Sequence, residues 1–282
     1  MITAKVIEDS EYLGTYRLTT MVLSYPRWVH AEFMTHRVFS RNASSSRAIP
    51  IAKMIERATK RTAFPVHWGK NQKGMQAFEE LSPKDQERAK NLWQAAAETA
   101  ARYAQELADI GVHKQIANRL IENFQNIEVV VTSSKWANFF ALRNHPDAQP
   151  EIQALAQAML AAYRASTPRR LGLGEYHLPF ITEAERSFGT PALTLCKMSA
   201  ARCARVSYLN HEGKVPTLEE DLALFDKLMA ANIKHASPPE HQAYPDEFAI
   251  GTYHGNLGFP WVQFRKTIEG ENIHAYEEIR DS

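Results

Sequence analysis

Residues 35–47, THRVFSRNASSSR, combine two arginines ten positions apart with a run of small hydroxyl side chains. Small hydroxyl residues compete with the regular backbone hydrogen bonds of helices and strands, so residues 38–50 are predicted to form a loop. The guanidinium groups of Arg37 and Arg47, together with the serine hydroxyls between them, are suited to a phosphate monoester. On composition alone, a solvated surface loop is the better explanation.

The patterns around this loop predict alternating strands and helices. Residues 12–25 are rich in Leu, Thr, Val and Tyr and are expected to form one or two strands, followed by a short helix that leads into the loop. Ser82 is a good N-cap, and Gly111 a good helix stop, for a long helix between them. We expect further elements at residues 113–123 (helix), 127–134 (strand), 149–166, 198–206 and 217–231 (helices).

A second candidate residue lies in residues 134–153, SKWANFFALRNHPDAQPEIQ. The aromatic side chains of Trp136, Phe139 and Phe140 are expected to bury this segment and to leave Arg143 beside an aromatic wall. Buried arginines are seldom left unpaired. Capping of a neighbouring helix therefore explains Arg143 as well as ligand binding does.

The overall composition excludes several classes of partner. The chain has 282 residues, of which 44% are hydrophobic, and its 33 Lys and Arg nearly balance its 32 Asp and Glu. A formal charge of +1 provides no general field for nucleic acid, so we expect no nucleic-acid partner and only a local anion site. No stretch reaches the roughly 20 apolar residues of a membrane span, and the N-terminus lacks a signal-peptide pattern. We expect a cytoplasmic protein without a membrane partner.

Two other groups of reactive side chains give weaker signals. The segment HASPPEH (235–241) contains two histidines and a glutamate, but it is not HExxH and fixes no third ligand, so no metal is expected. Cys196 and Cys203 form no CxxC pair. Cys203 lies among helix-forming residues, where a cysteine is usually a small buried hydrophobe.

Four segments of the chain share their pattern with one enzyme family. They are THRVFSRNASSSR (RHRxxSxNExSxR in the family), NFFALRNHPDAQPEI at 138–152 (NFLxLRxxxxAQxEI), AARCARVSY at 200–208 (AARxSY) and HASPPEH (HxSPxEH). The chain thereby resembles the flavin-dependent thymidylate synthases, the ThyX family, over residues 18–166 and 197–242. The order of the segments is altered, because the two that come first in the family lie here near the C-terminus.

The resemblance implies a fold and a reaction. The fold would be α+β, rich in helices, with a small mixed or antiparallel sheet. The enzyme would convert dUMP to dTMP with methylenetetrahydrofolate, using FAD that NADPH re-reduces, and without a cysteine nucleophile. It would be a homo-oligomer, a tetramer in the family, with nucleotide and flavin sites at subunit interfaces.

Site residues carry over motif by motif. Arg143 matches the arginine that contacts the pyrimidine ring and stabilises its polarised form, so it is the expected catalytic residue. The nucleotide is expected to contact Glu32, Ser45, Ser46, Arg47 and Arg143. Arg119 is expected to contact it from a second subunit, although Asn118 matches the same family position almost as well. The flavin is expected to contact His36, Arg37, Asn42, Asn138, His235, Ser237 and Glu240.

The chain also departs from the family pattern at positions that contact ligands. Family residues are replaced at Glu32 (usually Gln), Thr35 (Arg), Ala43 (Glu), Thr132 (Asn) and Ser134 (Arg). Losing two arginines should weaken phosphate or flavin contacts unless another cation substitutes, and the candidates are Lys70, Lys73, Lys135 and Arg265. These departures leave open dCMP as substrate, a hydroxymethylated product and a non-catalytic nucleotide-binding module.

Composition divides the chain into three parts. Residues 1–167 would form the ThyX-like core, with the nucleotide loop and Arg143. Residues 168–192, rich in Gly and Pro, would be a connector. Residues 193–282 would carry the AARxSY-like and HxSPxEH-like segments and pack on the core.

Overall fold

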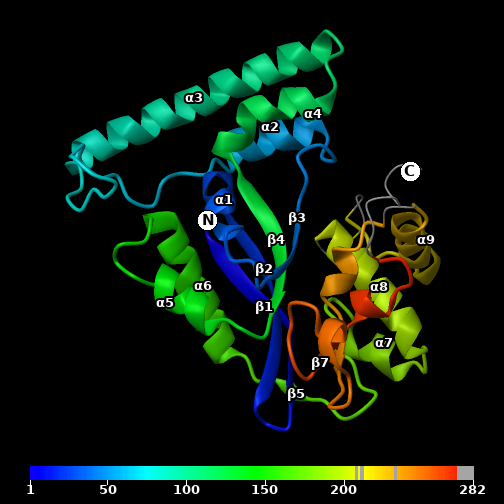
Figure 1. Ribbon diagram of the computed structural model, residues 1–282. Helices are drawn as coiled ribbons and strands as arrows, with labels where there is room; N and C mark the ends of the chain where they lie inside the picture. Colours follow the sequence, from blue (N-terminus) through cyan, green and yellow to red (C-terminus); the bar gives the residue numbers. More distant parts are fainter. Residues whose placement is uncertain (207–208, 210–212, 232–233, 272–282) are drawn as a thin grey trace, which may run out of the picture.

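A five-stranded mixed sheet forms the centre of the computed structural model, which describes residues 1–206, 209, 213–231 and 234–271 (Figure 1). The strand order is β3-β4-β2-β1-β5; all neighbours are antiparallel except β1 and β5, which are parallel. The strands are β1 (Thr3–Tyr12), β2 (Tyr16–Pro26), β3 (Ser40–Ala43), β4 (Asn126–Ser133) and β5 (Arg169–Arg170). The fold is therefore α+β, as expected.

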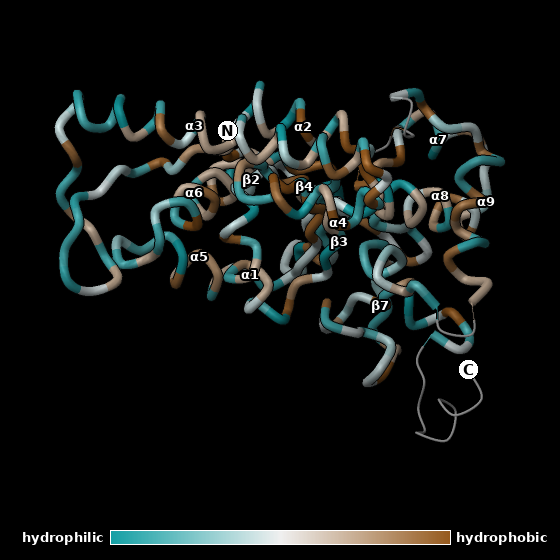
Figure 2. The backbone as a smooth tube through the Cα atoms, turned by 90° about the horizontal axis from the view of Figure 1, so that it is seen from above, coloured by the Kyte–Doolittle hydropathy of each residue, from teal (hydrophilic) through white to brown (hydrophobic). Residues whose placement is uncertain are grey.

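Both faces of the sheet are covered. On one face, Leu23, Val129 and Val131 pack in a core with α1, α5 and α6, and on the other, Val22 and Val130 contact Cys203 of α8. Strands that are buried on both sides have nearly continuous apolar runs, which explains the sequence IEVVV of β4. Figure 2 shows the same division from above, with α5 and α6 on one side of the strands and α8 and α9 on the other.

The helices form three groups around the sheet. The first covers one face: η1 (Arg27–Val29), α1 (His30–Phe33), α5 (Ala137–Arg143) and α6 (Pro150–Ala165). The second crosses the top of Figure 1: α2 (Ile51–Lys60), α3 (Pro83–Asp109), α4 (Lys114–Ala117) and η2 (Asn118–Phe124). The third lies on the other face: α7 (Glu183–Ser187), α8 (Ala192–Arg205), α9 (Leu218–Met229), η3 (Pro238–Glu240), η4 (Gly251–His254), η5 (Phe264–Thr267) and the small sheet of β6 (Ala243–Pro245) and β7 (Trp261–Gln263).

Most expected elements are confirmed. The oxygen Oγ of Ser82 accepts the Asp85 N–H at 3.2 Å and begins α3, and Thr217 begins α9 with a capping box. The loop expected over residues 38–50 is wrong in part, because Ser40–Ala43 form the edge strand β3 by pairing with Val129–Thr132. Hydrogen bonding to β4 therefore fixes the extended conformation of residues 40–43, which the local sequence does not predict.

A chain of hydrogen bonds between buried polar groups joins the sheet to the third group of helices. Its links are Ser10 Oγ to His177 Nδ1 (2.8 Å), His177 Nε2 to Thr20 (2.7 Å), Thr20 to Thr132 (2.6 Å) and Thr132 to His241 Nδ1 (2.8 Å). The Asn42 amide nitrogen donates to His241 Nε2 at 3.3 Å, which fixes the imidazole proton on Nδ1. The hydroxyls of Thr132 and Thr20 then each accept once and donate once, and Ser10 accepts from the Nδ1–H of His177. We call this set the threonine–histidine chain.

Candidate functional site

A cleft of about 1310 Å³ lies between residues 65–78 and the helices α5 and α6. Residues 65–78 are held across it by two contacts: the Val66 N–H donates to Glu151 Oε1 (3.0 Å) and the Gln76 amide donates to the Asp147 carbonyl (3.2 Å). Trp28, Glu32 and Arg143 form part of the wall. We call this hollow the Arg143 cleft.

Arg143, the last residue of α5, is fixed by polar groups of the α1 segment. Its Nε donates to His36 Nε2 at 2.9 Å, and its guanidinium forms an ion pair with Glu32. The side chains of Arg143 and Glu32 are 22% and 27% exposed, so the pair remains open to the cleft. Since His36 accepts this bond, its ring is neutral, and burial together with the Arg143 charge lowers the pKa of His36.

The aromatic residues near Arg143 support this arrangement indirectly. Trp136 and Phe139 are buried and pack against Phe39, with ring centroids 4.8 and 5.4 Å away. The His36 ring rests edge-on against Phe139 at 4.8 Å. The aromatic wall therefore positions the histidine that orients Arg143.

The expected phosphate loop lies elsewhere in the chain, after β3. Ser46 is buried, and its carbonyl accepts the Asn118 amide at 2.7 Å, so Asn118 holds the loop. Ser45 and Arg47 are exposed, and Arg47 has no ion-pair partner in the part of the chain that the structure describes. Arg119 is 58% exposed and pairs with Glu122.

Four of the expected flavin residues lie in β3 or in the HASPPEH segment beside it. The Asn42 amide nitrogen donates to the Ser237 carbonyl at 3.2 Å, and Glu240 forms an ion pair with Arg265. Burial raises the pKa of Glu240, although Arg265 acts in the opposite direction. His235 and the side chain of Ser237 are exposed in the same segment. The segment HASPPEH thus meets the strand of THRVFSRNASSSR within one chain.

The remaining flavin residues lie on the opposite face of the sheet. Successive side chains of a strand point to opposite faces, so Arg41 donates to the His36 carbonyl (3.0 Å) while Asn42 turns toward His241. His36, Arg37 and Asn138 therefore share the Arg143 side. Arg37 and Asn138 are exposed, and neither side chain has a hydrogen bond or an ion pair within the part of the chain that the structure describes. A guanidinium and an amide suit the diphosphate and carbonyl groups of a flavin dinucleotide.

The departures from the family pattern are accommodated in different ways. Thr132 is a link of the threonine–histidine chain, and Ser134 donates to the Leu257 carbonyl. Of the four candidate cations, Lys73 lines the Arg143 cleft. Lys135 is exposed. Lys70 forms an ion pair with Glu79, and Arg265 forms one with Glu240. Ser207 and Tyr208 of the AARCARVSY segment lie outside the described residues.

Sequence reasoning missed one wall of the cleft. Gln149, Gln153 and Gln157 line it from α6 and its N-cap. Their spacing of four residues places them on one helix face, and this spacing is visible in the sequence. Trp28, held edge-on by Trp93 at 5.7 Å, was expected only as part of a helical face.

Other kinds of chemistry find little support in the described residues. Burial raises the pKa of Cys196 to about 12, and also raises that of Cys203, so neither thiol ionises readily. Within residues 1–206, 209, 213–231 and 234–271, no group of three or more His, Cys, Asp or Glu could hold a metal ion. Over the same residues, no helix combines the length and hydropathy needed to cross a membrane.

Comparison with known proteins gives one family and several distant structures. Residues 13–169 match the sequence profile of the Thy1 family, described as thymidylate synthase complementing protein. The UMP/dUMP methylase PolB from Streptomyces cacaoi bound with 5-Br dUMP is 17% identical, with a TM-score of 0.48, over 58% of this chain and 90% of that chain. The flavin-dependent thymidylate synthase ThyX from Helicobacter pylori, complexed with FAD and dUMP, is 18% identical, with a TM-score of 0.36, over 52% and 67%. No curated protein matches the chain.

Proposed function

The chain belongs to the Thy1 family of thymidylate synthase complementing proteins, and from this premise we propose that it is a flavin-dependent enzyme that methylates a pyrimidine deoxynucleotide at C5. This is the reaction that converts dUMP to dTMP. The observation that carries the proposal is the position of Arg143, held by Glu32 and His36 at the wall of the 1310 Å³ cleft. The cleft is large enough for a nucleotide and a second planar ligand.

Arg143 has a defined role in this proposal. Its guanidinium is fixed before any ligand binds, so it can stabilise charge that develops on the pyrimidine without first being reorganised. The neutral His36 ring restricts the guanidinium to one orientation, because it accepts the Nε–H. In this reaction methylenetetrahydrofolate would supply the one-carbon unit, and bound FAD, once reduced by NADPH, would supply the hydride.

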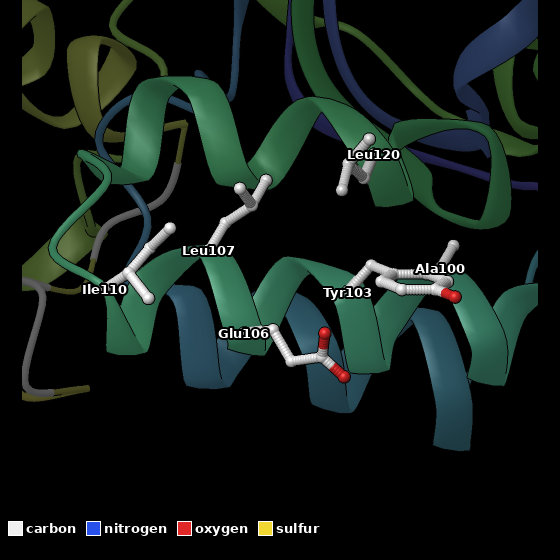
Figure 3. A pocket seen from close by; sticks show the side chains of 6 residues that line it. All are labelled: Ala100, Tyr103, Glu106, Leu107, Ile110 and Leu120. Atoms are coloured by element: carbon white, nitrogen blue, oxygen red, sulfur yellow. The ribbon is translucent and has the colours of Figure 1, made fainter.

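The phosphate of the nucleotide would be bound by Ser45, Ser46 and Arg47. No hydrogen bond or ion pair joins this loop to Arg143 in the described part of the chain, so we propose that two subunits complete each site. An apolar groove of about 510 Å³ supports a homo-oligomer. It lies near the loop, between α3 and η2, and Tyr103, Leu107 and Leu120 line it (Figure 3).

Flavin absorbance of the purified protein, before and after addition of FAD, is the first test. Formation of a C5-methylated nucleotide from dUMP or dCMP, with methylenetetrahydrofolate and NADPH, is the second. In single-turnover experiments, Arg143→Ala should slow flavin reoxidation more than it weakens nucleotide binding. Arg143→Lys should also be slow, because a point charge cannot replace the planar fork.

Two results would contradict the proposal. Calorimetry that shows no binding of oxidised or reduced FAD would leave only a non-catalytic nucleotide-binding module. A lower melting temperature of Arg143→Ala with unaltered flavin reoxidation would make Arg143 a structural residue that links α5 to α1.

A further inference from the structure

The Arg143 cleft carries an acceptor beside a fork of donors. Oε1 of Glu32 pairs with the Arg143 guanidinium, whereas Oε2 makes no hydrogen bond within residues 1–206, 209, 213–231 and 234–271. Both side chains line the cleft. A carboxylate oxygen can only accept hydrogen bonds, and a guanidinium can only donate them. Arg143 Nη2 also donates to Thr35 Oγ1 at 3.5 Å, so three of the five guanidinium N–H groups are used within the described residues. The pair therefore presents one acceptor beside the remaining donors at the wall of the cleft.

This order distinguishes the two pyrimidines. The edge of cytosine presents an amino donor, then a ring-nitrogen acceptor and a carbonyl acceptor. The edge of uracil presents a carbonyl, an N–H and a second carbonyl. A carboxylate accepts well from the cytosine amino group. Uracil can meet this pair only when shifted along the wall, with its N3–H on Glu32 and one carbonyl on Arg143, and its other carbonyl then has no donor from the pair.

The neighbouring side chain provides a surface for the base itself. Trp28 lies one helical turn before Glu32 and lines the same cleft. Its ring is held in place by Trp93 in an edge-to-face contact of 5.7 Å. An aromatic side chain that is already fixed can stack on a pyrimidine of either kind. Trp28 therefore supplies affinity, and Glu32 supplies the choice between bases.

We propose that the Arg143 cleft binds the amino edge of a cytosine deoxynucleotide, with Glu32 as the specificity-determining residue. This inference rests on the proposed function for the identity of the site, and adds to it the class of base. The amides of Gln149, Gln153 and Gln157, which also line the cleft, do not distinguish the two bases, because each carries both a donor and an acceptor and can be turned either way. Glu32 cannot be turned to donate.

Equilibrium binding of dCMP and dUMP to the full-length, FAD-supplemented protein tests the proposal without any substitution. We expect the wild-type protein to bind dCMP roughly ten- to a hundredfold more tightly than dUMP, the usual worth of one good base contact. Glu32→Gln should remove most of this preference, because its amide can donate to a uracil carbonyl. Glu87→Gln, on the exposed side of α3, is the matched control and should leave the preference unchanged.

The possible failures are distinguishable. Equal binding, or tighter binding of dUMP by the wild-type protein, would overturn the inference and leave the proposed function standing. A dCMP preference that persists in Glu32→Gln would remove Glu32 from the selection. If neither nucleotide binds, or if Arg143→Ala changes the affinity of neither, the cleft is not the nucleotide site, and the proposed function fails with the inference.

Discussion

Lowering the pH from 7 to 5 should destabilise the fold through the threonine–histidine chain. Burial lowers the pKa of His241 from its ordinary 6.5 to about 3, so the folded protein keeps this ring neutral at pH 5 while the unfolded chain takes up a proton. The unfolded state then binds more protons, and the free energy of unfolding falls as the pH falls. Each pH unit below 6.5 lowers the free energy of unfolding by about 1.36 kcal/mol through this one group. At pH 5, His241 alone therefore lowers it by about 2 kcal/mol.

His177 also lowers the free energy of unfolding as the pH falls. It is fully buried, and its pKa is lowered by burial first and then by the charges of Arg186 and Arg169. Carboxylates also titrate in this range, so the contribution of one histidine must be isolated by comparing variants. His241→Gln should be less stable than the wild type at pH 7, because it breaks the chain, but it should lose about 2 kcal/mol less between pH 7 and pH 5.

Urea unfolding followed by tryptophan fluorescence at pH 7, 6 and 5 measures this difference. His145→Gln is the control, since the His145 side chain is 57% exposed and its variant should keep the wild-type pH dependence. An unchanged pH dependence in His241→Gln would refute the reasoning. It would mean that His241 is protonated in the folded protein, or that solvent reaches it.

Three further outcomes are expected. Arg47→Ala should weaken nucleotide binding by ~1.5–3 kcal/mol in calorimetry, because it removes a charge-assisted contact, and unchanged affinities for dUMP and dCMP would make the loop a solvated surface. The double variant Cys196→Ser, Cys203→Ser should keep most of its turnover where circular dichroism shows it folded, since neither thiol ionises readily; loss of turnover would indicate a cysteine nucleophile. Arg202→Met should lower the free energy of unfolding by about 3–5 kcal/mol in urea titrations, because Arg202 is 2% exposed and bridges Glu185 and Asp221; a change below 1 kcal/mol would show that the network is dispensable.

Elements with local signals could be predicted from the sequence. Ser82 and Thr217 satisfy N–H groups within three residues of themselves, so their helices begin where the sequence indicates. The run IEVVV becomes a strand because both of its faces are apolar. The edge strand β3 has no such signal, since its order comes from a partner almost 90 positions away.

The arrangement of the candidate site was harder to predict for a similar reason. A motif places residues in order along the chain but does not say on which side of a sheet each one lies. Arg41 and Asn42 are neighbours in sequence, yet one contacts α1 and the other contacts His241. The ion pair of Glu32 with Arg143 joins residues more than 100 positions apart, and only the folded chain brings them together.

The burial of β4 on both faces has a consequence for work with fragments. The family match ends at residue 169, but the side chains of Val22 and Val130 are covered by α8, which begins at Ala192. A fragment cut at the end of the match would expose Val22 and Val130 to water and would leave two strand hydroxyls, those of Thr20 and Thr132, without their histidine partners. Newly exposed apolar side chains favour self-association. Recombinant expression should therefore keep residues 170–282 attached, because the sequence match ends within a packed part of the structure.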